Sequence, residues 1–163
     1  MSILRSKLNK LELLQKLNAW TIHVLIPIIV GGFLYILFRS ENLLMFKWVK
    51  SIRLTDEISS IRNFTLEIKY WIPKWIYFSL PDAIWVYSFS SALILIWKPK
   101  SFKILLLTLS IPFILGSGIE ILQLFKFFEG TFDTLDLFLC LLAQFLCILF
   151  YKLNRKKYFL IKT

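Results

Sequence analysis

The sequence is poor in residues that carry covalent chemistry, and it lacks the common cofactor-binding motifs. Its 163 residues include one histidine, two cysteines and five glycines. There is no glycine-rich phosphate loop, no zinc-finger spacing and no Ser-His-Asp arrangement around a recognisable nucleophile. On one helix, Cys140 and Cys147 would have Cα atoms roughly 10 Å apart, beyond the disulfide limit of about 7 Å. We therefore expect no cofactor and no disulfide, and we can name no catalytic residue, which favours binding over catalysis.

Charge is also scarce along four stretches of a chain that is 58% hydrophobic. The hydrocarbon layer of a bilayer is about 30 Å thick and takes roughly 20 apolar residues to cross as a helix. Spans are predicted near residues 19–38, 80–97, 103–125 and 134–151, which leaves too little polar surface for a soluble globule. The sequence thus predicts an all-α fold, a polytopic membrane helical bundle of about four transmembrane helices in a single domain, 1–163.

Two further segments are predicted to lie in the membrane interface. Residues 3–18 alternate basic and leucine side chains, as an amphipathic surface helix does. Residues 42–78 are rich in Trp and Tyr, which prefer the headgroup level, and the charged stretch 53–62 is expected to form an exposed turn. The basic N-terminus and the apolar run after it resemble a signal peptide. Since no Ala-x-Ala-like cleavage site follows, we predict a retained anchor.

The basic excess, a net charge of +10, predicts contact with an anionic lipid surface rather than with nucleic acid, because no nucleic-acid-binding module is present. Three lysines lie in the link 98–103, and four basic residues lie in 152–157. The positive-inside rule then places both termini in the cytoplasm, with the bundle in the plasma membrane (bacterial inner membrane). The connection 39–80 opposes this topology with seven basic residues, but a long interfacial loop weighs less in the rule.

Five polar residues flank or enter the spans at the end that this topology turns outward: Asp82, Glu120, Gln123, Asp133 and Asp136. The uncharged runs 83–97 and 137–151 are too short to cross the hydrocarbon layer, so their flanking acids should lie below the outer headgroups. An ionisable group at that depth is costly and marks a functional site. We predict that these five residues bind a substrate or, through carboxylate oxygens, a divalent cation.

Structural roles for the same acids stay open. Asp82, Asp133 and Asp136 can complement the N-terminal dipoles of their helices, with Gly130 and Thr131 as a turn and an N-cap. Glu120 lies near the negative end of its helix, where Lys126 or Lys74 would pair with it. His23 is expected to be hydrogen-bonded or interfacial rather than a ligand. Small residues on the third and fourth spans predict that these two helices form a closely packed hairpin.

A resemblance to a family is carried by two short motifs, Glu120-Ile-Leu-Gln123 and Thr131-Phe132-Asp133-Thr-Leu-Asp136. They resemble the signature of VanZ-like membrane proteins, in which E-x-x-Q is followed by R-x-F-D-x-x-D and then by N-x-x-G. The resemblance covers residues 116–147. It departs from the family at four positions, where Arg, Asn and two Gly are replaced by Gly130, Cys140, Ala143 and Cys147. It implies an envelope protein linked to teicoplanin-type glycopeptide resistance.

Two functions follow from these patterns. In the first, the outward acids bind an envelope substrate of the lipid-linked glycan or glycopeptide class. Alternatively, the protein is a non-catalytic structural or accessory subunit of a larger membrane complex, which it would contact through 3–18 and 42–78. The lipid bilayer is an expected partner in both cases. Ion transport is disfavoured, because no acid is predicted in the cytoplasmic half of the spans.

Overall fold

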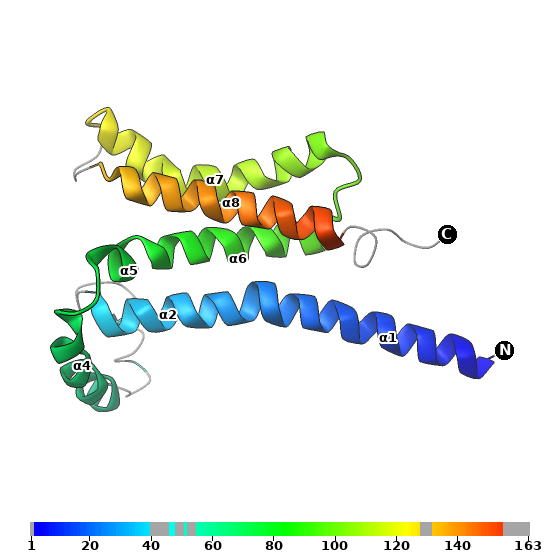
Figure 1. Cartoon of the computed structure of the whole chain (residues 1–163), viewed down its shortest axis with the longest axis horizontal. Helices are drawn as coiled ribbons and strands as arrows, with labels where there is room; N and C mark the ends of the chain where they lie inside the picture. Colours follow the sequence, from blue (N-terminus) through cyan, green and yellow to red (C-terminus); the bar gives the residue numbers. More distant parts are fainter. Residues whose placement is uncertain (1, 40–45, 48–50, 52–54, 128–131, 155–163) are drawn as a thin grey trace.

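The computed structural model describes residues 2–39, 46–47, 51, 55–127 and 132–154, and in these residues the protein is helical nearly throughout, with no strand. The all-α prediction is confirmed. The helices follow one another as α1 (Ser2–Trp20), the π-helical turn η1 (Thr21–Leu25), α2 (Ile26–Phe38), α4 (Thr55–Lys69), α5 (Lys74–Phe78), α6 (Leu80–Trp97), α7 (Phe102–Leu124) and α8 (Thr134–Asn154). Figure 1 shows α2, α6, α7 and α8 running side by side.

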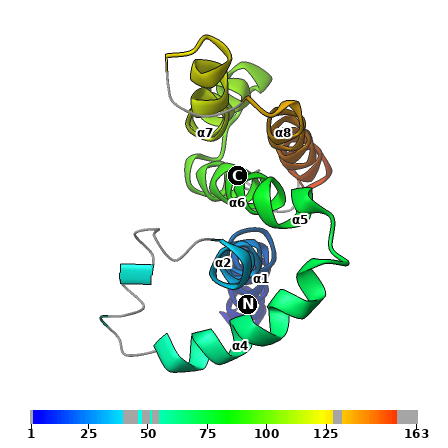
Figure 2. The ribbon, with the colours of Figure 1, turned by 90° about the vertical axis from the view of Figure 1, so that its left-hand side faces the viewer.

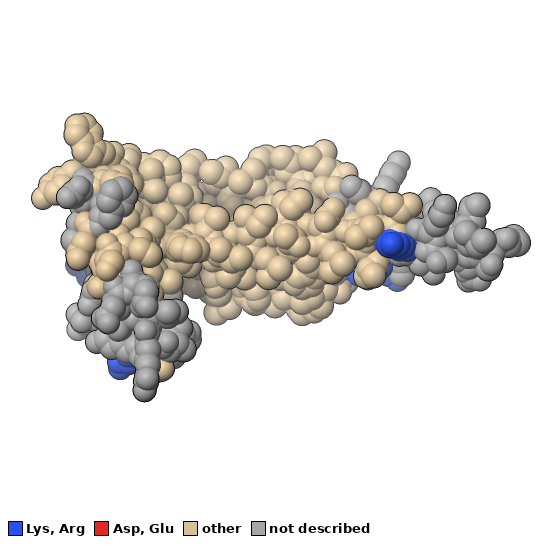
Figure 3. Space-filling model, turned by 90° about the horizontal axis from the view of Figure 1, so that it is seen from below, with Lys and Arg blue, Asp and Glu red and all other residues tan. Residues whose placement is uncertain are grey.

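Three helical stretches are long and apolar enough to cross a membrane: Lys10–Phe38, Leu80–Trp97 and Thr134–Asn154. A shorter apolar stretch, Phe102–Gly118, lies within α7, whose 23 residues measure about 34 Å at the usual rise per residue. On the face shown in Figure 3, the described Lys and Arg side chains appear only toward the two ends, with an uncharged band between them. The chain is therefore a multi-pass membrane protein.

Helix α6 is the centre of the bundle, because α2, α7 and α8 all pack against it. Two glycines bring neighbouring helices close to it. A Cβ atom at Gly31 of α2 would lie 3.4 Å from Ile84 Cγ2, and one at Gly116 of α7 would lie only 2.2 Å from Val86 Cγ2. Small residues permit such close approach between membrane helices. The predicted hairpin of α7 and α8 is present, and α6 packs against both of its helices.

Polar side chains tie these helices together inside the bundle. Gln144 donates a 2.8 Å hydrogen bond to Ser90 Oγ, and Ser88 donates one of 2.9 Å to the carbonyl of Val24 in η1. His23 Nδ1 lies 2.6 Å from the Tyr87 hydroxyl, so His23 is hydrogen-bonded, as predicted. Cys140 and Cys147 are free thiols. Such interhelical bonds hold membrane helices where lipid offers no polar partner.

The N-terminal helix differs in form from the prediction. Helices α1 and α2 join through η1 without a break, so residues 3–18 continue along the axis of the first span and extend beyond the ends of α6 and α8 (Figure 1). A π-helical turn inserts a residue into the helix without ending it. The interfacial position of residues 3–18 stays a prediction.

The connection between the first two spans contains a helix that the sequence analysis missed. The expected exposed turn at 53–62 is wrong for residues 55–62, which belong to α4. Figure 2 shows α4 beside α2, where Arg62 donates to the carbonyls of Ile36 and Arg39 at 2.5 and 2.9 Å. A helix end leaves such carbonyls without partners, so α4 caps α2. Residues 42–45, 48–50 and 52–54 of the predicted interfacial segment lie outside the described residues.

Candidate functional site: the acidic end of the bundle

The four acids predicted from the sequence lie at one end of the bundle, on three different helices. Asp82 is in the first turn of α6, Glu120 is in the last part of α7, and Asp133 and Asp136 are at the start of α8. We call this the acidic end. The Asp136 carboxyl lies within electrostatic range of the carboxyls of both Asp82 and Glu120. Gln123 is half-buried, three residues beyond Glu120 and thus on the same face of α7.

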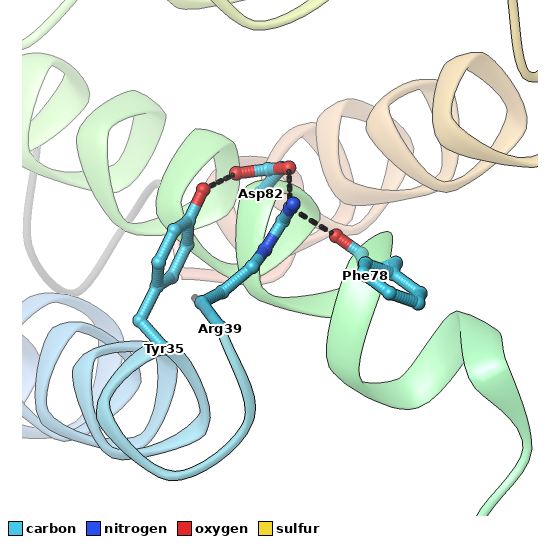
Figure 4. A network of polar contacts seen from close by, with 4 residues as sticks. All are labelled: Tyr35, Arg39, Phe78 and Asp82. Carbon is cyan, nitrogen blue, oxygen red and sulfur yellow. Dashed lines mark hydrogen bonds and ion pairs between the residues drawn. The ribbon is translucent and has the colours of Figure 1, made fainter. Parts of the chain in front are cut away.

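Asp82 is bound by Tyr35 of α2 and by Arg39, the C-cap residue of that helix (Figure 4). The Tyr35 hydroxyl donates to Oδ1 at 2.5 Å, and Arg39 Nη2 lies 3.2 Å from Oδ2. The same Nη2 also donates to the carbonyl of Phe78 at 2.7 Å. Burying a charge requires a partner of this kind. The ion pair keeps contact with solvent, because the Arg39 and Asp82 side chains are 26% and 39% exposed.

Asp133 caps α8, and its backbone ties that helix to α7. Its Oδ1 accepts a 2.8 Å hydrogen bond from the backbone N–H of Leu135, which is the N-cap arrangement. The backbone N–H of Asp133 in turn donates to Glu120 Oε2 at 3.0 Å. Asp133 therefore has a structural role as the N-cap of α8, a position that the sequence analysis gave to Thr131, which lies outside the described residues. Glu120 makes no ion pair with Lys126 or Lys74 in the described structure.

The buried polar atoms at this end include an acceptor, Asp136 Oδ1, and a donor, Arg39 Nε, that have no hydrogen-bond partner among the described residues. Leaving a buried polar group without a partner costs about 1–3 kcal/mol, and more if it is charged. Arg39 pairs with Asp82, and Asp82 interacts electrostatically with Asp136, so the donor and the acceptor both belong to residues near Asp82. A ligand that offers one acceptor and one donor would satisfy both.

The described acids do not form a metal site. Among the described His, Cys, Asp and Glu side chains, no group of three is arranged to hold an ion. The geometry therefore supports the binding of hydroxyl or amine groups more directly than the binding of a divalent cation. The cluster also offers no activated nucleophile, since the nearby thiol of Cys140 is buried among the carboxyls of Asp82, Asp136 and Glu120.

Sequence reasoning found the acids but missed Tyr35 and Arg39. These two residues are four positions apart at the end of the first apolar run, and this spacing places both on one face of a helix. The spacing was the sequence feature that could have identified them.

No family model, curated protein or solved structure matches this chain. The resemblance to VanZ-like proteins rests on residues 116–147 alone and stays a prediction.

Proposed function

We propose that this is a VanZ-like protein of the bacterial inner (plasma) membrane that binds an envelope substrate at an outward-facing acidic end. The substrate is of the lipid-linked glycan or glycopeptide class. The orientation is supported by the opposite end of the bundle, which collects a group of described basic residues: Lys10, Lys16, Lys98, Lys100, Lys103 and Lys152. By the positive-inside rule, that end and both termini are cytoplasmic.

The observation that carries the proposal is the unpartnered oxygen of Asp136. Asp82 is already engaged by Tyr35 and Arg39, and Asp133 is engaged as a helix cap. Asp136 Oδ1 is buried beside them and accepts no hydrogen bond in the described residues. A sugar hydroxyl or an amine of the substrate would donate to it, and a hydrogen bond to a charged group contributes about 1.5–3 kcal/mol. Binding without covalent chemistry fits the lack of a nucleophile in the cluster.

The test compares Asp136→Asn with the native protein in detergent, using two probes, teicoplanin and a polyprenyl-phosphate-linked N-acetylglucosamine. Asparagine keeps the size of the side chain but loses its charge, so the affinity for the true substrate class should fall at least about tenfold, or 1.4 kcal/mol. Glu12→Gln removes the same charge from an exposed position on α1 and should change nothing. The proposal fails if Asp136→Asn binds both probes as tightly as the native protein does.

The accessory-subunit function is favoured by a different observation. Four leucines on α1 (Leu11, Leu13, Leu14 and Leu17) are 48–58% exposed, and α1 extends beyond the ends of α6 and α8 (Figure 1). These leucines lie in the candidate span Lys10–Phe38, and on the part of α1 beyond the ends of α6 and α8 a helix of a partner subunit could pack against them. Purification in a gentle detergent followed by native mass spectrometry should then show a stoichiometric partner that Leu14→Glu releases. A monomer or homodimer alone would contradict this function.

A further inference from the structure

An apolar groove runs along the bundle and reaches the acidic end. It has a volume of about 330 Å³ and is lined by residues of three helices, among them Pro27 and Val30 of α2, Leu80 and Ala83 of α6, and Leu139 and Leu146 of α8. Val30 and Leu146 are 45% and 46% exposed, so the groove opens sideways from the bundle. At that depth the surrounding medium is the hydrocarbon of the bilayer.

The groove ends where the polar cluster begins. Leu139 lies three residues, or about one helical turn, beyond Asp136 and on the same face of α8, and Leu80 is in the turn of α6 that carries Asp82. The apolar cavity and the polar, charged cluster are thus continuous along α8. A molecule that fills both must have a hydrocarbon chain joined to a polar headgroup.

The charged side chains at the acidic end indicate which headgroup the ligand has. Arg39 has a buried Nε donor without an acceptor, and its side chain is one-quarter exposed, which suits a phosphate oxygen, a preferred partner of guanidinium groups. The unpartnered Asp136 Oδ1 suits a hydroxyl donor. A sugar attached through a phosphate to a lipid offers first a phosphate oxygen, next to the hydrocarbon chain, and then the hydroxyl donors of the sugar.

We infer that the ligand is a lipid-linked glycan phosphate, whose hydrocarbon tail occupies the groove between α2, α6 and α8. Its phosphate contacts Arg39 and a sugar hydroxyl donates to Asp136. This inference rests on the proposed function and narrows it, because a substrate without a hydrocarbon chain cannot fill the groove.

The experiment measures binding in nanodiscs by native mass spectrometry. The probes are polyprenyl-phosphate-linked N-acetylglucosamine, the same sugar phosphate with a methyl group in place of the polyprenyl chain, and phosphatidylcholine as a plain phospholipid. Leu146→Trp fills the groove. Phe145→Trp is the matched control, because Phe145 is the neighbouring residue of α8, is 59% exposed and does not line the groove.

The polyprenyl probe should bind at least about tenfold more tightly than its methyl counterpart, or 1.4 kcal/mol, because its tail packs against the walls of the groove; transfer out of water does not contribute, since the tail is already in lipid. Leu146→Trp should remove this advantage and leave the methyl probe unaffected, and Phe145→Trp should bind both as the native protein does. Equal behaviour of the two tryptophan variants, or equally tight binding of phosphatidylcholine, overturns the inference.

Asp136→Asn separates this inference from the proposed function. If it weakens binding of both sugar probes while Leu146→Trp weakens neither, the groove assignment is wrong and the proposed function stands. If it weakens neither sugar probe nor teicoplanin, the proposed function fails, and the inference fails with it.

Discussion

Gly116 is the position where a single methyl group should most disturb the bundle. The Cβ atom of Gly116→Ala would lie 2.2 Å from Val86 Cγ2, whereas ordinary contacts begin at 3.4 Å, so α7 would have to move away from α6 by about 1 Å or more. Val86 is fully buried, and its β-branched side chain has one strongly preferred rotamer in a helix. Overpacking of this kind costs about 1–3 kcal/mol, against a helix-propensity gain of about 1 kcal/mol for alanine over glycine.

Gly118 provides the matched control on the same helix, because a Cβ atom there meets nothing within 4 Å. Gly118→Ala should keep the propensity gain without the clash, so the two variants should differ in unfolding free energy by about 1–3 kcal/mol. Equilibrium unfolding in mixed detergent micelles, followed by circular dichroism, measures this difference. Adding Val86→Ala to Gly116→Ala should recover part of the loss. Equal stability of the two alanine variants would refute the close packing of α6 and α7.

Three further predictions concern the acidic end. Asp133→Ala should lower the unfolding free energy by about 1 kcal/mol and Asp133→Asn by much less, because Asn is an equally good N-cap. Thermal unfolding measures the stability of the two variants, and an equal loss of stability in both would contradict the capping role of Asp133. Tyr35→Phe removes the hydrogen bond to Asp82 and should cost about 1.5–3 kcal/mol, but little in an Asp82→Asn background if the two groups are coupled. Arg62→Ala removes the donor to two carbonyls at the end of α2. The backbone amides of residues 33–39 should then exchange faster with solvent, whereas those of α8 should exchange as in the native protein. If the variant changes the exchange rates of the two segments equally, the capping role of Arg62 is contradicted.

The transmembrane helices could be predicted because the bilayer imposes a length on apolar runs. Helix α6 occupies 80–97, as the apolar run indicated, and α8 covers the predicted span with three more residues at its C-terminus. The continuity of α1 and α2 could not be predicted, since a change from basic to apolar composition resembles a boundary. The helix α4 was missed for a related reason, because its charged residues resemble a turn. The cap that it provides for α2 through Arg62 is a contact between segments far apart in the sequence, which no local pattern indicates.

For the candidate site, the sequence indicated which polar residues lie at the depth of the membrane but not which side chains they contact. Asp82, Glu120 and Asp136 stand out because charges are rare beside apolar runs, and the structure places them together. Their individual roles depend on residues far away in the chain. Asp82 is bound by Tyr35 and Arg39, 47 and 43 residues earlier, and only the packing of α2 on α6 at Gly31 brings these groups together. Asp136 differs in that its side chain meets Glu120, while its Oδ1 accepts no hydrogen bond among the described residues.

The same contacts bear on the basic residues that oppose the predicted topology. Of the seven in 39–80, Arg39 is paired with Asp82, Arg62 binds the end of α2, and Lys69 lies 5.1 Å from the centre of the Tyr77 ring. Each has a structural reason to be at the acidic end, whichever side of the membrane that end faces. The lysines in the short link between α6 and α7 lie at the opposite end of the bundle from these residues. Since the positive-inside rule is counted over short loops, these lysines are the better guide to orientation, and they favour an outward acidic end.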